Sequence, residues 1–272
     1  MGTVKTTLQE ITERLLVIEE ELGLLNRRIA GEPFWELIRS GVRRKILGEV
    51  GMYSKKEDPR IQGTRHLARL VFHILTNSLF RNPYLAGHAD ILFFGMYRRR
   101  LLEDGFWHDI YCDSLIEQLE KDGVRCLMVE RPPFGRPIPG PVKTRQLSYY
   151  DFIEVCALLA RHLGFTRVRF SADDRAFLDK LQERITREFG ISLNLELHVK
   201  QALETEKSLL PFYRALLSKV APKAVVVVNS AGHIQLIKAC RERGIPLIEL
   251  QQGALHQYLL EGPHTAGGRK EY

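Results

Sequence analysis

Hydrophobic and polar positions along this chain are grouped in blocks that predict helices first and strands later. Apolar residues recur at intervals of three and four from Leu8 to Leu25, which predicts an amphipathic helix with Glu19, Glu20 and Glu21 on its outer side. A second amphipathic helix follows from Phe34 to Ile46, and its polar face carries Arg39, Arg43, Arg44 and Lys45. A third helix is predicted over residues 64–80. Residues 1–86 are therefore interpreted as a helical amino-terminal segment.

Short apolar runs alternate with helical patterns in the rest of the chain. A continuous run such as AVVVV is typical of a parallel strand whose two faces are both covered by helices. This alternation predicts an α/β fold, a Rossmann-like parallel sheet with helices on both faces, over residues 87–258. Residues 259–272 are predicted to be a flexible tail. The strands are expected at Ala89–Gly95, Val124–Glu130, Lys223–Val228 and Pro246–Leu250, with a further short candidate at Thr166–Phe170.

Small and polar residues follow the predicted strands directly. In parallel sheets the ligand crevice lies beyond the carboxyl ends of the strands, so these residues are the candidates for substrate binding. Backbone N–H groups at a strand-to-helix turn can face an anion, although Asn229 or Ser230 can equally cap the next helix. An arginine such as Arg98 can hold a phosphate or an acidic sugar, or can be plain surface. The substrate-binding candidates are Gly95, Arg98, Asn229, Ser230, Gly232, Gln251, Gln252 and Gly253.

Composition and charge narrow the possible partners. The 272 residues contain 40 Lys and Arg against 33 Asp and Glu, a net charge of +7 that permits contact with nucleotide phosphates or an anionic membrane. No RNA-recognition or zinc-finger signature is present, so no nucleic-acid partner is expected. The four cysteines form no CxxC pair, and no glycine-rich phosphate loop occurs, so neither a metal nor a cofactor is predicted.

The chain has no apolar run of the roughly 20 residues that span a bilayer, and its first residues lack the apolar stretch of a secretory signal. A cytoplasmic location is therefore expected. The basic amino-terminal helices suit peripheral contact with the inner membrane face, or simply packing against neighbouring helices.

Five segments of the chain read FWELIRSGVRRKIL, ADILFFG, LEDGFWHDIYCDSLIEQL, VVVVNSAG and IPLIELQQGALHQY. Together they resemble a group of bacterial proteins of surface or capsular polysaccharide synthesis that look like glycosyltransferases of the two-Rossmann-domain (GT-B) type. The resemblance implies that this chain is the amino-terminal, acceptor-binding half, and that the missing half binds the nucleotide sugar. Gln252 stands where the family pattern has histidine.

Sugar transfer requires a base for the acceptor hydroxyl and stabilisation of the leaving diphosphate. His256 is the candidate catalytic base under the resemblance, or else an exposed tail histidine. His233 is a weaker candidate for this base than His256. Asp109 and Asp113 can bind a metal or act as acid and base, or one of them can cap a helix.

Three functions remain open from the sequence. The first is transfer of a sugar from a nucleotide sugar to a glycan or lipid-linked acceptor, by a protein that is either complete or truncated. The second is a non-catalytic module, derived from such an enzyme, that binds an acceptor or works with a partner domain or as a homodimer. The third is polyol-phosphate transfer.

Overall fold

The computed structural model describes residues 8–50, 64–131, 140–144 and 146–250, which fall into two compact units. The first unit contains residues 8–50 and 164–207 of the described chain, and the second contains the described parts of 64–163 and 208–250. This division differs from the sequence-based boundary at residues 86 and 87. Residues 64–86 belong with the sheet, and residues 164–207 belong with the amino-terminal helices. The expected tail at 259–272 lies outside the described residues.

The first unit is built around a core of helices. α1 (Leu8–Glu21), α2 (Trp35–Glu49), α6 (Ala172–Phe189) and the first part of α7 (Leu195–Val220) surround it, with a short hairpin of β1 (Arg28–Ile29) and β2 (Glu32–Pro33). The apolar stripes predicted for α1 and α2 are buried in this core. The expected strand at Thr166–Phe170 does not form; instead Val168 and Phe170 add their side chains to the same core.

A buried ion pair joins α1 to α2 and corrects two expectations. Arg39 donates from Nε and Nη2 to the two carboxylate oxygens of Glu19, each at 2.6 Å. Glu19 is 3% exposed and Arg39 is 2% exposed, whereas the sequence pattern places both on solvated faces. Arg43 is also buried. The two hydrogen bonds between the guanidinium and the carboxylate make burial of both charges possible, because each of them replaces a hydrogen bond to water that is lost on folding.

We expect Glu19→Ala to lower the free energy of unfolding by about 3–5 kcal/mol, because a buried guanidinium loses its counter-ion. Urea unfolding followed by circular dichroism measures this change. The matched control is Glu21→Ala on the same helix, since Glu21 forms an exposed ion pair with Arg184 at 3.1 Å. Exposed pairs contribute at most about 1 kcal/mol. Equal losses in the two variants would contradict the assigned role of the buried pair.

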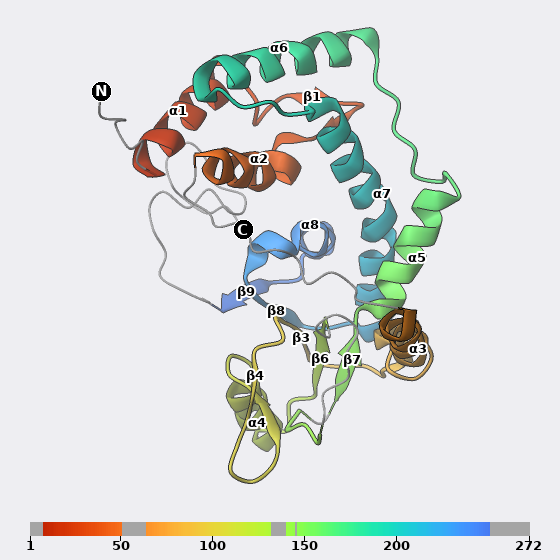
Figure 1. The fold of residues 1–272 in the computed structure, drawn as a ribbon. Helices are drawn as coiled ribbons and strands as arrows, with labels where there is room; N and C mark the ends of the chain where they lie inside the picture. The colour runs from red at the N-terminus through yellow and green to blue at the C-terminus, as the bar shows by residue number, and fades with distance from the viewer. Residues whose placement is uncertain (1–7, 51–63, 132–139, 145, 251–272) are drawn as a thin grey trace. The chain divides into compact units, whose positions relative to one another are not determined.

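The second unit contains a five-stranded sheet in the order β7-β6-β3-β8-β9, with every neighbouring pair parallel. Figure 1 shows these strands side by side. The sheet confirms the predicted fold class, a Rossmann-like α/β arrangement. Its strands are β3 (Ile91–Gly95), β6 (Cys126–Glu130), β7 (Leu147–Tyr149), β8 (Ala224–Val228) and β9 (Leu247–Leu250).

Both faces of the sheet are covered, as the continuous apolar runs predict. One face packs Leu92 and Phe94 against α5 (Asp151–His162), the second part of α7 and α8 (Ile234–Glu242). The other face packs Phe93 and Met128 against α4 (Asp113–Lys121). α3 (Thr64–Phe80) lies against α5, and β4 (Arg99–Leu101) forms a hairpin with β5 (Trp107–Asp109). Short 3₁₀ turns occupy Pro83–Leu85 (η1) and Ser230–Gly232 (η3). Among the described residues, no helix has the length and apolar character needed to cross a membrane.

Candidate functional site

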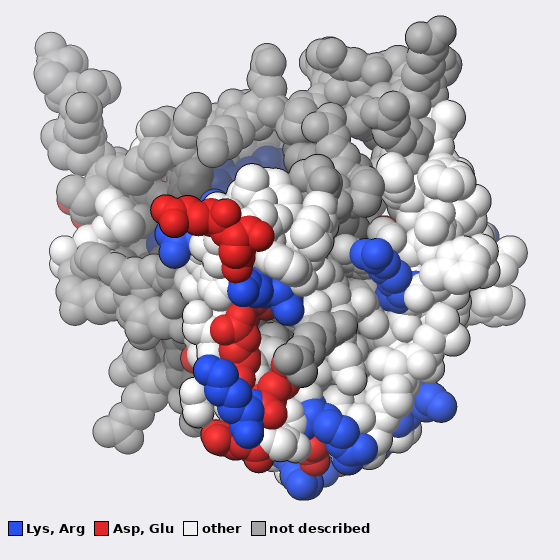
Figure 2. All heavy atoms as spheres, turned by 90° about the horizontal axis from the view of Figure 1, so that it is seen from below, with Lys and Arg blue, Asp and Glu red and all other residues white. Residues whose placement is uncertain are grey.

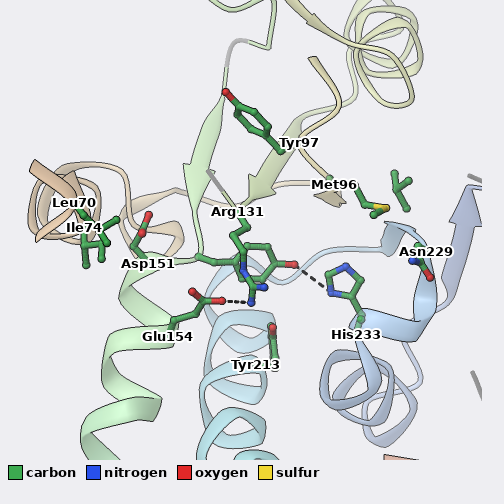
Figure 3. A pocket seen from close by; sticks show the side chains of 14 residues that line it. Leu70, Ile74, Met96, Tyr97, Arg131, Asp151, Glu154, Tyr213, Asn229 and His233 are labelled. Atoms are coloured by element: carbon green, nitrogen blue, oxygen red, sulfur yellow. Dashed lines mark hydrogen bonds and ion pairs between the residues drawn. The ribbon is translucent and has the colours of Figure 1, made fainter. Parts of the chain in front are cut away.

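A cavity of about 720 Å³ opens at the carboxyl ends of four strands of the second unit. Met96 and Tyr97 follow β3, Arg131 follows β6, Tyr150 follows β7 and Asn229 follows β8, and all five line the cavity (Figure 3). The remaining wall comes from helices and turns: Leu70 and Ile74 of α3, Asp151 and Glu154 of α5, Tyr213 of α7, and Gly232 and His233 before α8.

The strand order explains why the cavity forms there. β3 and β8 are hydrogen-bonded neighbours, yet the chain continues from β3 to β6 on one side and from β8 to β9 on the other. Adjacent strands whose connections leave in opposite directions open a crevice at their carboxyl ends, and this is where α/β proteins bind ligands. The cavity therefore occupies the position that the topology favours for a binding site.

Two cavity residues have left-handed backbone conformations. Tyr97 has φ of +55° and Asn229 has φ of +67°. Asparagine tolerates this region, whereas a bulky tyrosine is uncommon there and raises the backbone energy by about 1–3 kcal/mol. Such conformations persist where the surrounding structure holds them, and they gather at ligand sites. Both residues turn the chain sharply after a strand and direct it around the cavity.

An aromatic cluster containing a histidine forms one wall. The Tyr150 hydroxyl lies 3.2 Å from Nδ1 of His233, and the two rings are nearly parallel at 17°. Phe94 packs against both rings at 5.5–5.6 Å between centroids. Burial, followed by the nearby charge of Arg131, lowers the pKa of His233 to about 4. Burial also raises the pKa of Tyr150 well above its usual value. At neutral pH the site therefore presents an uncharged imidazole beside an uncharged phenol.

Among the described residues that line the cavity, one carries a positive charge and two carry carboxylates, so the cavity has no net positive charge. Arg131 forms an ion pair with Glu154 at the rim, drawn as a dashed line in Figure 3. Asp151 accepts a hydrogen bond from Nδ2 of Asn77 at 3.0 Å, and burial, with a smaller effect from Glu154, raises its pKa. One cation against two carboxylates disfavours a diphosphate and suits an uncharged ligand rich in hydroxyl groups.

A buried charge network adjoins the cavity wall behind Gly95. The guanidinium of Arg99 contacts both carboxylate oxygens of Glu130 at 3.1 and 3.2 Å and Oδ2 of Asp113 at 3.2 Å. Burial raises the pKa of Glu130 to about 7, although Arg99 opposes that shift. A Cβ at position 95 would meet Cε of Met128, the flexible end of that side chain, and would lie 3.9 Å from Oε2 of Glu130, which is ordinary contact.

The structure brings three of the predicted binding residues together. Gly95, Asn229 and Gly232 line the cavity. Ser230 is buried, and its N–H donates to Oε1 of Glu249 at 3.0 Å. Arg98 is exposed and is not part of the cavity wall. The other candidates, Gln251, Gln252, Gly253 and the predicted base His256, lie outside the described residues.

Asp109 and Asp113 hold the turn that leads into α4, but neither caps the helix, because its N-cap residue is Cys112 and no side chain accepts a capping hydrogen bond there. Oδ1 of Asp109 accepts hydrogen bonds from the backbone N–H groups of Tyr111 and Cys112, at 3.0 and 2.8 Å. Asp113 accepts from the backbone N–H of Asp109 at 2.6 Å and also contacts Arg99. Among the described residues, no group of three or more His, Cys, Asp or Glu is arranged to hold a metal ion.

The sequence alone does not identify Tyr150 or Arg131 as residues of the cavity. The sequence predicts a helix over Tyr149–Gly164, which would contain Tyr150, but β7 ends at Tyr149 and α5 begins at Asp151. Arg131 opens the proline-rich stretch Arg131–Pro141, which the sequence predicts to be neither helix nor central strand; a loop of this length is usually functional or disordered, but the sequence does not single out Arg131. The segment ahead of α5, Leu147–Tyr149, forms a further parallel strand of this sheet, but three residues with a serine at the centre give no strand pattern in the sequence. No protein-family model, curated protein or solved structure matches the chain.

We expect His233 to remain neutral well below its ordinary pKa of 6.5. The unfolded chain takes up a proton on this histidine below about pH 6.5, whereas the folded chain takes one up only near pH 4. The contribution of neutral His233 to the stability of the folded state is therefore complete above pH 6.5 and is lost as the pH falls toward 4. NMR titration of the imidazole measures the pKa directly.

Unfolding free energies of wild type and His233→Asn at about pH 7 and about pH 5 test the same point. The variant should lose less stability than wild type on acidification. His162→Asn is the control, because His162 is exposed. An NMR pKa of His233 near 6.5 would contradict the burial argument.

Proposed function

We propose that this chain is the acceptor-binding half of a glycosyltransferase-like protein of bacterial surface polysaccharide synthesis. In this role the cavity holds a glycan or the glycan part of a lipid-linked acceptor, which receives a sugar from a nucleotide sugar bound elsewhere. The observation that carries the proposal is the cavity at the crossover between β3 and β8, lined by hydroxyl, amide and carboxylate groups beside aromatic rings.

The chemistry of the wall supports a sugar in preference to a nucleotide diphosphate. The phenol hydroxyls of Tyr97 and Tyr213 and the amide of Asn229 can both donate and accept hydrogen bonds, as vicinal sugar hydroxyls require. The apolar faces of tyrosine rings can pack against the C–H groups of a sugar ring. Arg131 is already paired with Glu154, so little positive charge remains for a diphosphate.

Gly232→Leu tests the use of this cavity. Gly232 lines it, has no positive φ and has no atom within 4 Å of the position that a Cβ would take, so a leucine is accommodated at the cavity wall without strain. We expect calorimetry to show saturable binding of oligosaccharides released from bacterial surface polysaccharide, and at least about tenfold weaker binding of UDP-glucose, GDP-mannose and CMP-N-acetylneuraminic acid. The substitution should abolish oligosaccharide binding.

Gly87→Leu is the matched control, because Gly87 is exposed and also has open space at its Cβ position. It should bind as wild type does. Tight binding of a nucleotide sugar without oligosaccharide binding would assign the cavity to the donor instead. Failure of both ligand classes to bind would refute the proposal.

A second candidate, the non-catalytic binding module, is favoured by the state of His233. A histidine with a pKa of about 4 is a weak proton acceptor at neutral pH, so it is poorly suited to be the base that activates an acceptor hydroxyl. In this interpretation the chain keeps the acceptor site and relies on a partner for transfer.

Gln252→His distinguishes a degraded catalytic site from a binding module. If the site has only lost its histidine, the variant should raise sugar transfer from UDP-glucose to a bound oligosaccharide above the wild-type rate, as a radiolabel transfer assay would show. Gln252→Asn is the control, since it keeps an amide. No gain in a variant that still binds oligosaccharide would favour the binding module.

A further inference from the structure

His233 is held in one position at the start of α8. Its backbone N–H donates to the carbonyl of Ser230 and its carbonyl accepts from the N–H of Ile237, each at 2.9 Å. Its ring packs against the rings of Tyr150 and Phe94. Because both the backbone and the ring are fixed, the two ring nitrogens of His233 have different and constant surroundings.

The hydroxyl of Tyr150 determines which of these nitrogens carries the proton. Tyr150 is 5% exposed, and the hydrogen-bonding partner of its hydroxyl among the described residues is Nδ1 of His233. A buried hydroxyl proton without an acceptor is costly, so the hydroxyl donates to Nδ1. Burial keeps the imidazole neutral by lowering its pKa, and a neutral imidazole has one donor nitrogen and one acceptor nitrogen. The proton of His233 therefore lies on Nε2.

Nε2 of His233 is open to the cavity. In Figure 3 Nδ1 is turned toward the Tyr150 hydroxyl, and the second ring nitrogen points away from it. No described residue forms a hydrogen bond with Nε2, and this atom is not enclosed by the protein. Since His233 lines the cavity, its Nε2–H is a hydrogen-bond donor that a ligand can reach.

Apolar side chains line the cavity beside this donor. Met96 packs against the buried cluster that contains Val228, and both residues line the cavity. Met96 and Asn229 lie on the same side of Arg131 as His233 does (Figure 3). We call Met96, Val228, Asn229 and His233 the His233 corner of the cavity.

An N–H donor beside apolar side chains suits a carbonyl oxygen that carries a methyl group. A ligand hydroxyl donates as well as accepts, and Nε2 in this tautomer has no lone pair to receive the hydroxyl proton. A ligand carboxylate is disfavoured, because the cavity contains Asp151 and Glu154 against the single cation Arg131. Figure 2 shows acidic and basic side chains interspersed on the face that it presents, so the described charges there form no extended cationic region that would attract anions.

We infer that the His233 corner binds the acetamido group of an N-acetylated sugar. The carbonyl oxygen of that group accepts the hydrogen bond from Nε2–H of His233, and its methyl group packs on Met96 and Val228. Tyr150 is a positioning residue that acts through His233, because its hydroxyl fixes the tautomer. The inference names the class of acceptor and rests on the proposed function, in which the cavity binds a glycan.

Calorimetry with two matched disaccharides tests the assignment. N,N′-diacetylchitobiose and cellobiose have the same ring configuration and linkage, and they differ in the acetamido groups. We expect the full chain to bind diacetylchitobiose at least about tenfold more tightly, because cellobiose lacks the carbonyl oxygen that pairs with Nε2–H.

Tyr150→Phe tests the role of the hydroxyl, because it keeps the ring and removes only the donor to Nδ1. The preference for diacetylchitobiose should fall to about threefold or less. Tyr84→Phe is the matched control, since the Tyr84 hydroxyl donates to the carbonyl of Phe212 and Tyr84 is not among the lining residues. It should keep the wild-type preference. Nitrogen NMR of the His233 imidazole, without ligand, should show the proton on Nε2 in wild type and both tautomers in Tyr150→Phe.

Four results would overturn the inference. One is a wild-type imidazole with its proton on Nδ1. Another is an unchanged preference in Tyr150→Phe. Equal affinity for the two disaccharides would remove the acetamido assignment and leave the proposed glycan binding intact. If neither disaccharide binds, the inference also fails, and the oligosaccharides released from bacterial surface polysaccharide report separately on the proposed function.

Discussion

The cavity depends on one constraint, the parallel pairing of β3 with β8 between connections that leave in opposite directions. The pairing buries the interiors of both strands, where only apolar side chains are accommodated, so hydrogen-bonding and charged groups are confined to the residues that follow. Tyr97, Arg131, Tyr150 and Asn229 each lie within two residues of a strand end. The interiors of the strands thus stabilise the fold through apolar packing, and the residues at their carboxyl ends provide the polar groups of the cavity.

The segment after β3 is held by charge more than by apolar packing. Arg99 links the β4–β5 hairpin to Glu130 at the end of β6 and to Asp113 at the start of α4. Thr144 joins this network by accepting a hydrogen bond from Nη2 of Arg99 at 3.0 Å. Removing such a group from water is costly unless its hydrogen bonds are all replaced, so the network favours one arrangement of these segments. The same network forms the support behind Gly95 in the cavity wall.

The sequence predicts the parallel sheet and its helices well, because a continuous apolar run such as that of β8 has few structural alternatives. It predicts the site less well. A charged residue in a helical pattern indicates exposure, so the pattern misses the buried pair of Glu19 and Arg39, since only the folded chain brings together residues twenty positions apart. Tyr150 resembles any aromatic residue at a helix start, and its role follows from contact with His233, 83 positions away. Asn229 is found because the end of β8 can be located from the pattern alone, whereas after β3 the pattern selects Arg98, which is not part of the cavity wall, in place of Tyr97.

The two compact units are interleaved along the chain, and this affects their order of assembly on the ribosome. The core of the first unit joins side chains of α1 and α2 to side chains of α6 and α7, so it cannot close until about residue 207 has been synthesised. Until then the apolar stripe of α1 can pack against α2 but not against α6 or α7. The sheet of the second unit is also incomplete at that point, because β8 and β9 come later. Both cores are therefore completed only when the last third of the chain has been synthesised.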